Sequence, residues 1–277
     1  MLWKKLFTPV ENLEAHEVRS FMASHKEGDY TLLDVRQPGE YEEAHLPGAK
    51  LIPVPQLSDR LDEIDTGKPV VVYCAVGGRS RAAAQLLAGK GYEEVYNLKG
   101  GIKAWEGKIS AVPVDLGALA LTGQETVSDV LILIYAMESG LERFYQFAAG
   151  QVADPGVKDL LEKLAGIEAK HKVRLHGLFS EMNPDLEAED RFEKAATSAV
   201  MEGGFDMETF LEQNLQVMES ASGVLDLAMM LEVHGLDLYL RYAREVESKQ
   251  GKETLYQLAE EEKAHLRALG ELLEKQV

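Results

Sequence analysis

The stretch Val70–Leu87 reads VVVYCAVGGRSRAAAQLL and divides into three parts. The apolar run Val70–Tyr73 predicts a buried strand. A short loop follows over Cys74–Arg79, and a helix is expected from about Ser80. Open α/β sheets carry their reactive groups at the carboxyl ends of strands, which is where Cys74 lies. This stretch therefore predicts an α/β domain with a functional loop after a central strand.

The loop has the composition of an anion-binding cradle around Cys74, the only cysteine in the chain. Gly77 and Gly78 allow the backbone to curl so that successive N–H groups point inward, and the following helix adds its positive end. Such a setting favours the thiolate, which is the nucleophilic form of cysteine, and would also hold a persulfide. The alternative is that Cys74 is a small buried apolar side chain.

Five motifs occur in order in the first part of the chain: Leu33–Arg36 (LDVR), Glu40, His45–Ala49 (HLPGA), Cys74–Ser80 (CAVGGRS) and Gly100–Trp105 (GGIKAW). With these motifs, residues 10–108 resemble the single-domain rhodaneses. The resemblance implies a sulfurtransferase in which Cys74 attacks a sulfane sulfur donor, such as thiosulfate or a persulfide, and passes the sulfur to a thiol acceptor. The length of the loop also resembles that of sulfur-transferring rhodaneses, whereas phosphatase relatives have a longer loop.

The resemblance also assigns roles to other residues of this region. Besides Cys74, it makes Arg79 a catalytic residue. The substrate-binding loop would consist of Ala75, Val76, Gly77, Gly78 and Ser80. Arg79 either steers an anionic sulfur donor or holds the loop by pairing with Asp34 or Glu40. Arg36 and Arg81 either line the mouth of the site or lie on the surface.

The length of 277 residues is sufficient for two domains, each with a core of its own. In the first domain, residues 1–108, alternating strands and helices predict a parallel sheet covered on both faces. The expected helical segments are 13–26, 57–64 and 80–90, with a loop and a helical turn at 38–43. The expected strands are 30–35, 51–54, 70–73 and 94–98. Residues 109–124 lose this rhythm and are expected to form a linker.

From residue 125 to residue 277 the pattern becomes helical. Long helices are expected up to about residue 151 and over 156–182, 221–248 and 252–275. A connection of roughly forty residues separates the second of these helices from the third, and it should contain a helix after Asp206. Two helical hairpins joined by a long crossover have the connectivity of a ferritin-like four-helix bundle.

The helical half contains an internal repeat with an interval of 94 residues. Glu138, Tyr145, Glu168 and His171 recur as Glu232, Tyr239, Glu262 and His265. Residues three apart share a helix face, so each Glu-x-x-His pair presents both side chains on one side. Leucine, isoleucine and methionine occupy the neighbouring positions of the same faces. The pattern therefore predicts four glutamates buried together in the bundle.

Buried carboxylates need positive charge, because each unpaired ion would cost several kcal/mol. Two divalent metal ions would balance four carboxylates, and neutral imidazoles would add ligands without adding charge. The alternative is that these residues are ordinary surface charges. A single Glu-x-x-His sequence is not sufficient evidence, since Glu42 and His45 also form one within the α/β region. There we expect no metal, and His45 is expected to be a structural histidine.

Two lone glutamates and two Glu-x-x-His pairs resemble the di-iron carboxylate pattern of the rubrerythrin and ferritin-like families, over about residues 125–277. The resemblance implies two terminal carboxylate ligands, two bridging carboxylates and two capping histidines. In that order these are Glu138 and Glu232, Glu168 and Glu262, and His171 and His265. Tyr145 and Tyr239 would be outer-sphere donors or radical guards, with amphipathic core tyrosines as the alternative. Two iron ions are expected, although manganese or zinc would fit the same ligand types.

Two features depart from the rubrerythrin pattern. Rubrerythrins carry a further glutamate three residues after the ligand on the third helix, and this chain has Gly235 there. It also has no Cys-x-x-Cys pair to deliver electrons. Peroxidase activity therefore does not follow from the resemblance alone. His234 points away from the ligand face and is expected at the surface or at an interface.

The formal net charge is −18 and is unevenly distributed, with −2 on residues 1–112 and −16 on the remainder. The acidic half argues against nucleic acid or an anionic membrane as a partner. A lone cysteine suggests a reducing compartment, and neither a secretory signal nor a membrane span is recognisable, so we expect a cytoplasmic protein. The expected partners are a small sulfur-containing substrate, a thiol acceptor, an external electron donor and a second copy of the chain in a homodimer.

These features lead to three hypotheses about function. The first is a rhodanese-type sulfurtransferase fused to a di-iron redox domain that handles oxygen, peroxide or electrons. The second is a rubrerythrin-like di-iron peroxidase or oxidase, in which the rhodanese-like part senses sulfur or redox state. The third is a metal-binding or interaction module in which both sites are vestigial.

Overall fold

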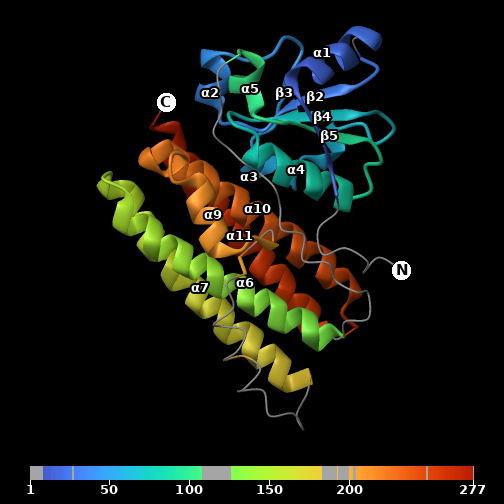
Figure 1. Cartoon of the computed structure of the whole chain (residues 1–277). Helices are drawn as coiled ribbons and strands as arrows, with labels where there is room; N and C mark the ends of the chain where they lie inside the picture. Colours follow the sequence, from blue (N-terminus) through green and yellow to red (C-terminus); the bar gives the residue numbers. More distant parts are fainter. Residues whose placement is uncertain are drawn as a thin grey trace.

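The computed structural model describes residues 9–26, 28–107, 126–182, 192, 200–201, 204–247 and 249–276. Within them, a five-stranded sheet flanked by helices lies against a set of long helices (Figure 1). The α/β and four-helix architectures expected from the sequence are confirmed. The expected linker, 109–124, lies outside the described residues. No helix in the described part of the chain has both the length and the apolar content needed to cross a membrane.

The sheet is parallel and has the strand order β1-β5-β4-β2-β3. Its strands are β1 (Glu11–Leu13), β2 (Thr31–Asp34), β3 (Lys50–Leu51), β4 (Val70–Tyr73) and β5 (Val95–Leu98). Every residue of β4 is buried, because this strand is central and both faces of the sheet are covered. The Cys74 loop therefore begins at the carboxyl end of the central strand, as the sequence predicts.

Helices cover both faces of this sheet (Figure 1). On one face lie α1 (Ala15–Ser24) and α5 (Gly101–Trp105), and on the other lie α3 (Val54–Leu57) and α4 (Gly78–Gly89). The remaining elements of the α/β part are α2 (Pro38–Glu43) and the 3-10 turn η1 (Leu61–Glu63).

Three local predictions were wrong or incomplete. The expected strand 51–54 ends at Leu51, because Pro53 and Pro55 have no N–H to donate to a strand ladder, and α3 begins at Val54 instead. The expected helix 57–64 divides into the end of α3 and the η1 turn. Strand β1 was not predicted, since three residues are too few to show an alternating pattern.

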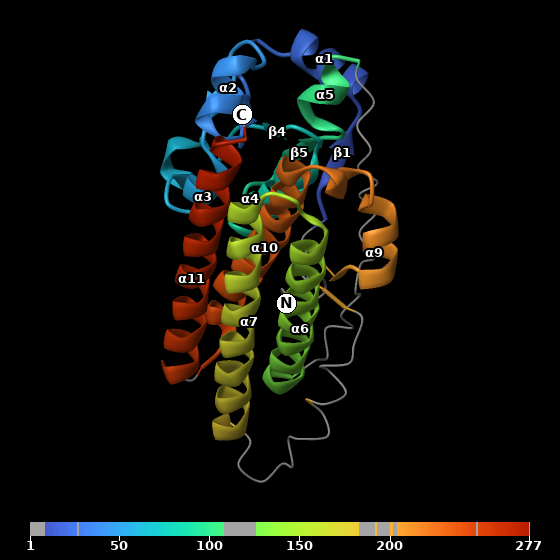
Figure 2. The same cartoon turned by 90° about the vertical axis from the view of Figure 1, so that its left-hand side faces the viewer.

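The bundle consists of two antiparallel helical hairpins (Figure 2). One hairpin is formed by α6 (Val127–Gln151) and α7 (Pro155–Met182), and the other by α10 (Ala221–Glu245) and α11 (Lys249–Glu274). The segment before α10 contains the short helix α9 (Met207–Asn214), which begins after Asp206 as predicted, and the 3-10 turn η3 (Val217–Glu219). The side chains of Asp206 and Ser220 cap the first turns of α9 and α10.

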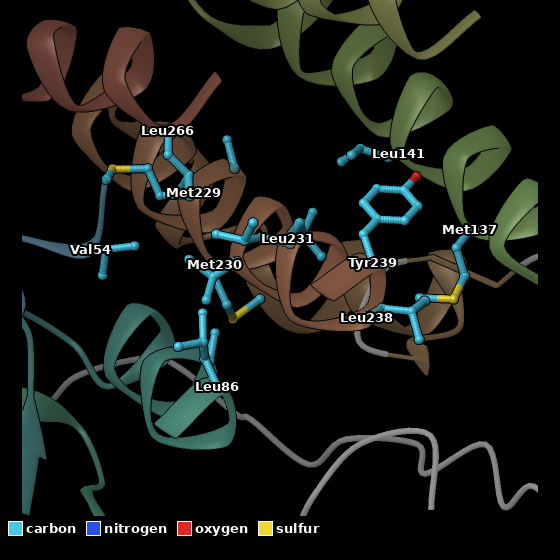
Figure 3. Packing of buried hydrophobic residues seen from close by; sticks show 14 of the residues in the cluster. Val54, Leu86, Met137, Leu141, Met229, Met230, Leu231, Leu238, Tyr239 and Leu266 are labelled. Carbon is cyan, nitrogen blue, oxygen red and sulfur yellow. The ribbon is translucent and has the colours of Figure 1, made fainter. Parts of the chain in front are cut away.

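The two parts of the chain share one hydrophobic core, although the sequence suggested separate ones. Helix α4 packs along α10, and Leu86 of α4 lies beside Met230 of α10 (Figure 3). The buried apolar side chains under this face of the sheet form a single cluster with those of the bundle. Polar ties add to the contact, since Lys263 of α11 forms an ion pair with Asp59 at 2.7 Å. The α/β part therefore packs on the α10–α11 hairpin.

Candidate functional site

The six predicted metal ligands lie together inside the bundle. They come from all four long helices: Glu138 from α6, Glu168 and His171 from α7, Glu232 from α10, and Glu262 and His265 from α11. All six side chains are buried, with at most 4% of the residue surface exposed. They form two sets of four, and Glu168 and Glu262 belong to both sets. Within each set the ligand atoms lie within 4.8 Å of one another.

The first set is centred on Nδ1 of His171. This atom lies 2.8 Å from Glu168 Oε2, 3.3 Å from Glu262 Oε1 and 3.5 Å from Glu138 Oε2. The i, i+3 spacing of Glu168 and His171 places both side chains on the face of α7 that points into the bundle.

The second set repeats this arrangement around Nδ1 of His265. The distances are 3.0 Å to Glu262 Oε2, 3.3 Å to Glu232 Oε1 and 3.5 Å to Glu168 Oε1. The imidazole rings of His171 and His265 are nearly parallel, with centroids 5.6 Å apart. The internal repeat seen in the sequence therefore becomes an approximate two-fold symmetry of the site, with Glu168 and Glu262 between its halves.

The electrostatics of the cluster reflect crowded negative charge. Burial, together with Glu138 and Glu262, raises the pKa of Glu168 well above its usual range, and burial and Glu262 raise that of Glu232 to about 8. Burial alone would lower the pKa of His265, but the carboxylates of Glu232 and Glu262 raise it to about 12. In the absence of a metal ion, Glu168, Glu232 and His265 therefore tend to keep their protons.

The donor set fits two divalent cations. Several buried atoms at the centre have no hydrogen-bond partner: Glu138 Oε2, both oxygens of Glu168, Glu262 Oε1 and Nδ1 of His171. Polar atoms buried in this way cost free energy unless a cation takes the place of a donor. Carboxylates and imidazoles are ligands for iron, manganese and zinc, and the two shared glutamates lie where bridging ligands would be needed.

The two predicted tyrosines differ from each other. Tyr145 is fully buried and its hydroxyl donates a hydrogen bond to Glu232 Oε1. Tyr239, shown in Figure 3 near Leu141, is equally buried, but its hydroxyl has no hydrogen-bond partner among the described residues. The two tyrosines of the sequence repeat are therefore not equivalent, since of the two only Tyr145 donates a hydrogen bond to a glutamate of the cluster.

Glu261 is a site residue that sequence reasoning missed. Its Oε2 lies 3.1 Å from Nε2 of His171, on the side of the ring opposite to Nδ1, which faces the other carboxylates, and both of its oxygens accept hydrogen bonds from Arg174. A carboxylate behind a metal-binding histidine fixes the orientation of the ring and increases its basicity. The internal repeat could not reveal Glu261, because the equivalent position in the first half of the repeat is the apolar Ile167. The two histidines are therefore not equivalent.

The Cys74 loop has part of the predicted cradle. The N–H of Gly77 donates to Cys74 Sγ at 3.1 Å, and Ser80 Oγ lies 3.4 Å from the same sulfur. Gly77 has φ +99°, a left-handed conformation that glycine adopts without strain. The sulfur is fully buried, as the alternative interpretation of Cys74 would have it, while the backbone donor is what the anion cradle requires. Of the residues from 74 to 80, only Ala75 is not fully buried.

The motif Gly100–Trp105 clamps this loop from the side of α5. The N–H of Ile102 donates to the carbonyl of Cys74 at 2.9 Å, and that of Lys103 donates to the carbonyl of Ala75 at 3.2 Å. A Cβ atom at Gly101 would overlap the carbonyl oxygen of Cys74. The motif therefore acts through its backbone, which passes too close to the loop for a side chain to fit at Gly101.

Arg79 holds the loop rather than facing a substrate. Its guanidinium is fully buried and makes two hydrogen bonds to Glu40, at 2.8 and 2.7 Å. Of the two partners considered from the sequence, Glu40 is therefore the one used. Asp34 instead pairs with Arg36 at 2.7 Å, so Arg36 is buried and occupied. A further contact of Arg79, with Asp226 of α10, was not foreseen.

Two predictions about other histidines can be placed. His45 is exposed, stacks on Tyr41 and contacts its carbonyl through Nδ1, and it lies far from the bundle ligands, in agreement with a structural role. His234 is buried between α10 and its neighbours, where burial and the charges of Arg81 and Arg241 lower its pKa to about 3. The predicted surface location is therefore wrong, and the charge of Arg81 on α4 reaches His234 from the α/β part.

Known proteins resemble the two halves of this chain separately. The family model of the rhodanese-like domain matches residues 17–108, and that of rubrerythrin matches residues 129–221. The chain is 54% identical over 80 residues to the uncharacterized protein YqhL of Bacillus subtilis, which covers 29% of this chain and 64% of that protein. It is 38% identical over 106 residues to the rhodanese-like/PpiC domain-containing protein 12, chloroplastic, of Arabidopsis thaliana, covering 36% of each chain.

Among solved structures, a rhodanese-related protein from Thermoplasma volcanium is 30% identical, with 36% of this chain and 95% of that chain covered and a TM-score of 0.32. The chain spans less than two thirds of the length of the two curated relatives. The parallel sheet and the Cys74 loop define a rhodanese-like fold, and the glutamate–histidine cluster defines a ferritin-like bundle. Residues 17–108 of this chain therefore match the rhodanese-like domain family, and residues 129–221 match the rubrerythrin family.

Proposed function

We propose that the rhodanese-like domain is a sulfurtransferase that carries sulfane sulfur as a persulfide on Cys74. The observation that carries this proposal is the N–H of Gly77 directed at Cys74 Sγ at the carboxyl end of the central strand. A backbone donor at this place stabilises negative charge on the sulfur, both in the Cys74 thiolate and in the Cys74 persulfide.

The reaction consists of two displacements that balance without an external oxidant. In the first, the Cys74 thiolate attacks the outer sulfur of thiosulfate, a new S–S bond forms, and the bond to sulfite breaks with its electron pair leaving on sulfite. In the second, an acceptor thiolate attacks the outer sulfur of the Cys74 persulfide and the Cys74 thiolate leaves. Splitting the transfer in this way requires one nucleophile to be bound and oriented for both steps.

Other residues of the loop bind and orient rather than react. Arg79 is engaged by Glu40, so it fixes the base of the loop instead of contacting the donor. A donor would approach beside Ala75, the one loop residue that retains exposure, with side chains over Cys74 moving aside. Ser80 is held by Asn97, to which its hydroxyl donates at 2.6 Å, and this keeps the hydroxyl next to the sulfur.

The test is the formation of thiocyanate from thiosulfate and cyanide by the full-length protein and by Cys74→Ser. We expect the variant to lose all turnover, because serine carries no sulfur and is a far weaker nucleophile. Glu93→Gln, at an exposed position between α4 and β5, serves as a control that should retain turnover. Wild-type turnover in Cys74→Ser would show that Cys74 is not the nucleophile.

For the helical domain we propose a redox centre of two iron ions. Glu138 and Glu232 would bind one metal each, Glu168 and Glu262 would bridge them, and His171 and His265 would coordinate through Nδ1. When bound, iron supplies one-electron chemistry toward oxygen or peroxide. The chain's own residues exclude water from the cluster, and Tyr145 holds a proton on the hydrogen bond to Glu232. Metal analysis of protein purified without added metal tests the identity of the ions.

A second candidate function is a di-iron peroxidase or oxidase in which the rhodanese-like domain senses sulfur. Two observations favour it: the ligand set of the metal centre is complete, and the thiol of Cys74 is enclosed. Stopped-flow mixing of the ferrous protein with peroxide and with oxygen distinguishes the candidates. Rapid oxidation by either one, together with an inert Cys74, would favour this second function, and slow oxidation by both would remove it.

A further inference from the structure

The buried guanidinium of Arg79 lies between carboxylates from both domains. Glu40 of α2 accepts two hydrogen bonds from its terminal nitrogens. Asp226 of α10 approaches from the bundle, with Oδ1 2.6 Å from Nε, as an electrostatic contact in which neither atom makes a hydrogen bond of normal geometry. Arg79 closes the Cys74 loop, so a residue of the helical domain reaches the base of the sulfur site.

Asp226 is not needed to neutralise Arg79, because Glu40 already does so. The three side chains together carry a net charge of −1 in a largely buried place, with 10% of the Glu40 and 12% of the Asp226 side chain exposed, and such a charge is costly. The pKa of Asp226 reflects this cost, since burial is the main cause that raises it to about 6. Glu40 raises this pKa as well, whereas Arg79, Lys103 and Arg36 lower it. A surplus, largely buried carboxylate next to an arginine that is already paired therefore suggests a role other than stability.

Helix α10 also supports the loop directly. A Cβ atom at Gly78 would lie 3.1 Å from Sδ of Met230, so α10 backs the first turn of α4 at van der Waals distance. On its opposite side the loop is clamped by the backbone of Ile102 and Lys103. The Cys74 loop is thus held between α5 of its own domain and α10 of the bundle.

The same helix carries a ligand of the metal centre. Glu232 follows Asp226 by six positions, which corresponds to about 9 Å along a helix axis. Between them lies Met230, which contacts Gly78. One continuous helix therefore joins the carboxylate that binds metal to the carboxylate that holds Arg79.

We propose that Asp226 is a positioning residue of the sulfur site, supplied by the helical domain, which fixes Arg79 and thereby the Cys74 loop. This inference rests on the proposed sulfur transfer for its functional meaning, but its structural content can be measured separately.

The test compares Asp226→Asn with Asp237→Asn in the full-length protein. Asp237 is a matched control, because it is a largely enclosed aspartate on the same helix that pairs with an arginine, Arg241, at 2.9 Å. It lies, however, beside Gly89 at the far end of α4. Hydrogen–deuterium exchange of the segment 74–80 measures the loop, and exchange at the end of α4 measures the control region.

Asp226→Asn should accelerate exchange of the 74–80 amides by on the order of tenfold, because the loop loses its support from α10. The single-turnover rate constant for persulfide formation from thiosulfate should fall roughly tenfold to a hundredfold. The amount of persulfide formed should equal that of the wild type if the variant is fully folded. A slower rate at equal amplitude then shows a less well positioned loop rather than a smaller folded fraction. Asp237→Asn should change exchange only near Gly89 and leave the rate constant unchanged.

Wild-type exchange of the loop in Asp226→Asn, or equal effects of both variants on the loop, would overturn the proposal. If Asp226→Asn does not fold, Asp226→Ser removes the same charge with a smaller side chain and takes its place. A wild-type protein that forms no persulfide would refute the proposed sulfur transfer, while the exchange experiment would still decide whether Asp226 positions the loop.

Discussion

Without bound metal, the stability of this protein should fall steeply as the pH rises from 6 to 8. The reason lies in Glu232, whose pKa is raised to about 8 by burial and by Glu262. An unfolded chain loses that proton near pH 4.5, so between these values the folded, metal-free protein holds one proton more than the unfolded chain. Stability then decreases with increasing pH.

The magnitude follows from the number of protons. One retained proton changes the free energy of unfolding by about 1.4 kcal/mol per pH unit, so Glu232 alone contributes about 2–3 kcal/mol between pH 6 and pH 8. His265 acts in the same direction, since its pKa is raised to about 12 and its stabilising contribution is lost as the pH rises above its unfolded value. A total of about 3–5 kcal/mol corresponds to a midpoint shift on the order of 10 °C.

The assay is thermal unfolding at pH 6, 7 and 8 of chelator-treated protein and of iron-loaded protein. Metal replaces the protons on the ligands, and its binding strengthens with increasing pH, so the loaded protein should not show the decline. Glu232→Gln should flatten the decline of the metal-free protein, whereas Glu271→Gln, an exposed glutamate of α11, should leave it unchanged. A metal-free midpoint that stays constant or rises toward pH 8 would refute the reasoning.

Three further predictions concern individual residues. Glu261→Gln should weaken iron binding about tenfold to a hundredfold, because the His171 ring loses its orienting carboxylate, and Glu260→Gln should not; equilibrium titration with ferrous iron measures both, and equal effects would contradict the assignment. In urea unfolding of metal-free protein, Tyr145→Phe should cost about 1–3 kcal/mol and Tyr239→Phe distinctly less, since only Tyr145 has a partner. Gly101→Ala should abolish sulfur transfer in the thiocyanate assay by displacing Cys74, whereas Gly107→Ala, at a similar positive φ with open space around it, should retain transfer; activity in both would argue against the clamp.

The residues of both sites could be identified from the sequence because each signal is local or regular. The strand, the loop and the helix around Cys74 are contiguous, so the position of the thiol at a strand end needs no knowledge of distant contacts. The six metal ligands recur at one interval on apolar helix faces, and burial of those faces brings them together. The ends of α3 and the strand β1 were missed because elements of three or four residues carry too little periodicity.

By itself, the sequence determined the two folds, the strand-end cysteine, and the six glutamates and histidines that gather in the bundle, since these depend on patterns within single elements. Only the tertiary structure decided which further carboxylates contact the site residues: Glu261 contacts His171, and Asp226 contacts Arg79. These pairs join residues far apart in the chain, and their distances follow from how α7 packs on α11 and α4 on α10. No periodicity encodes that packing, because it results from the fit of two complete surfaces.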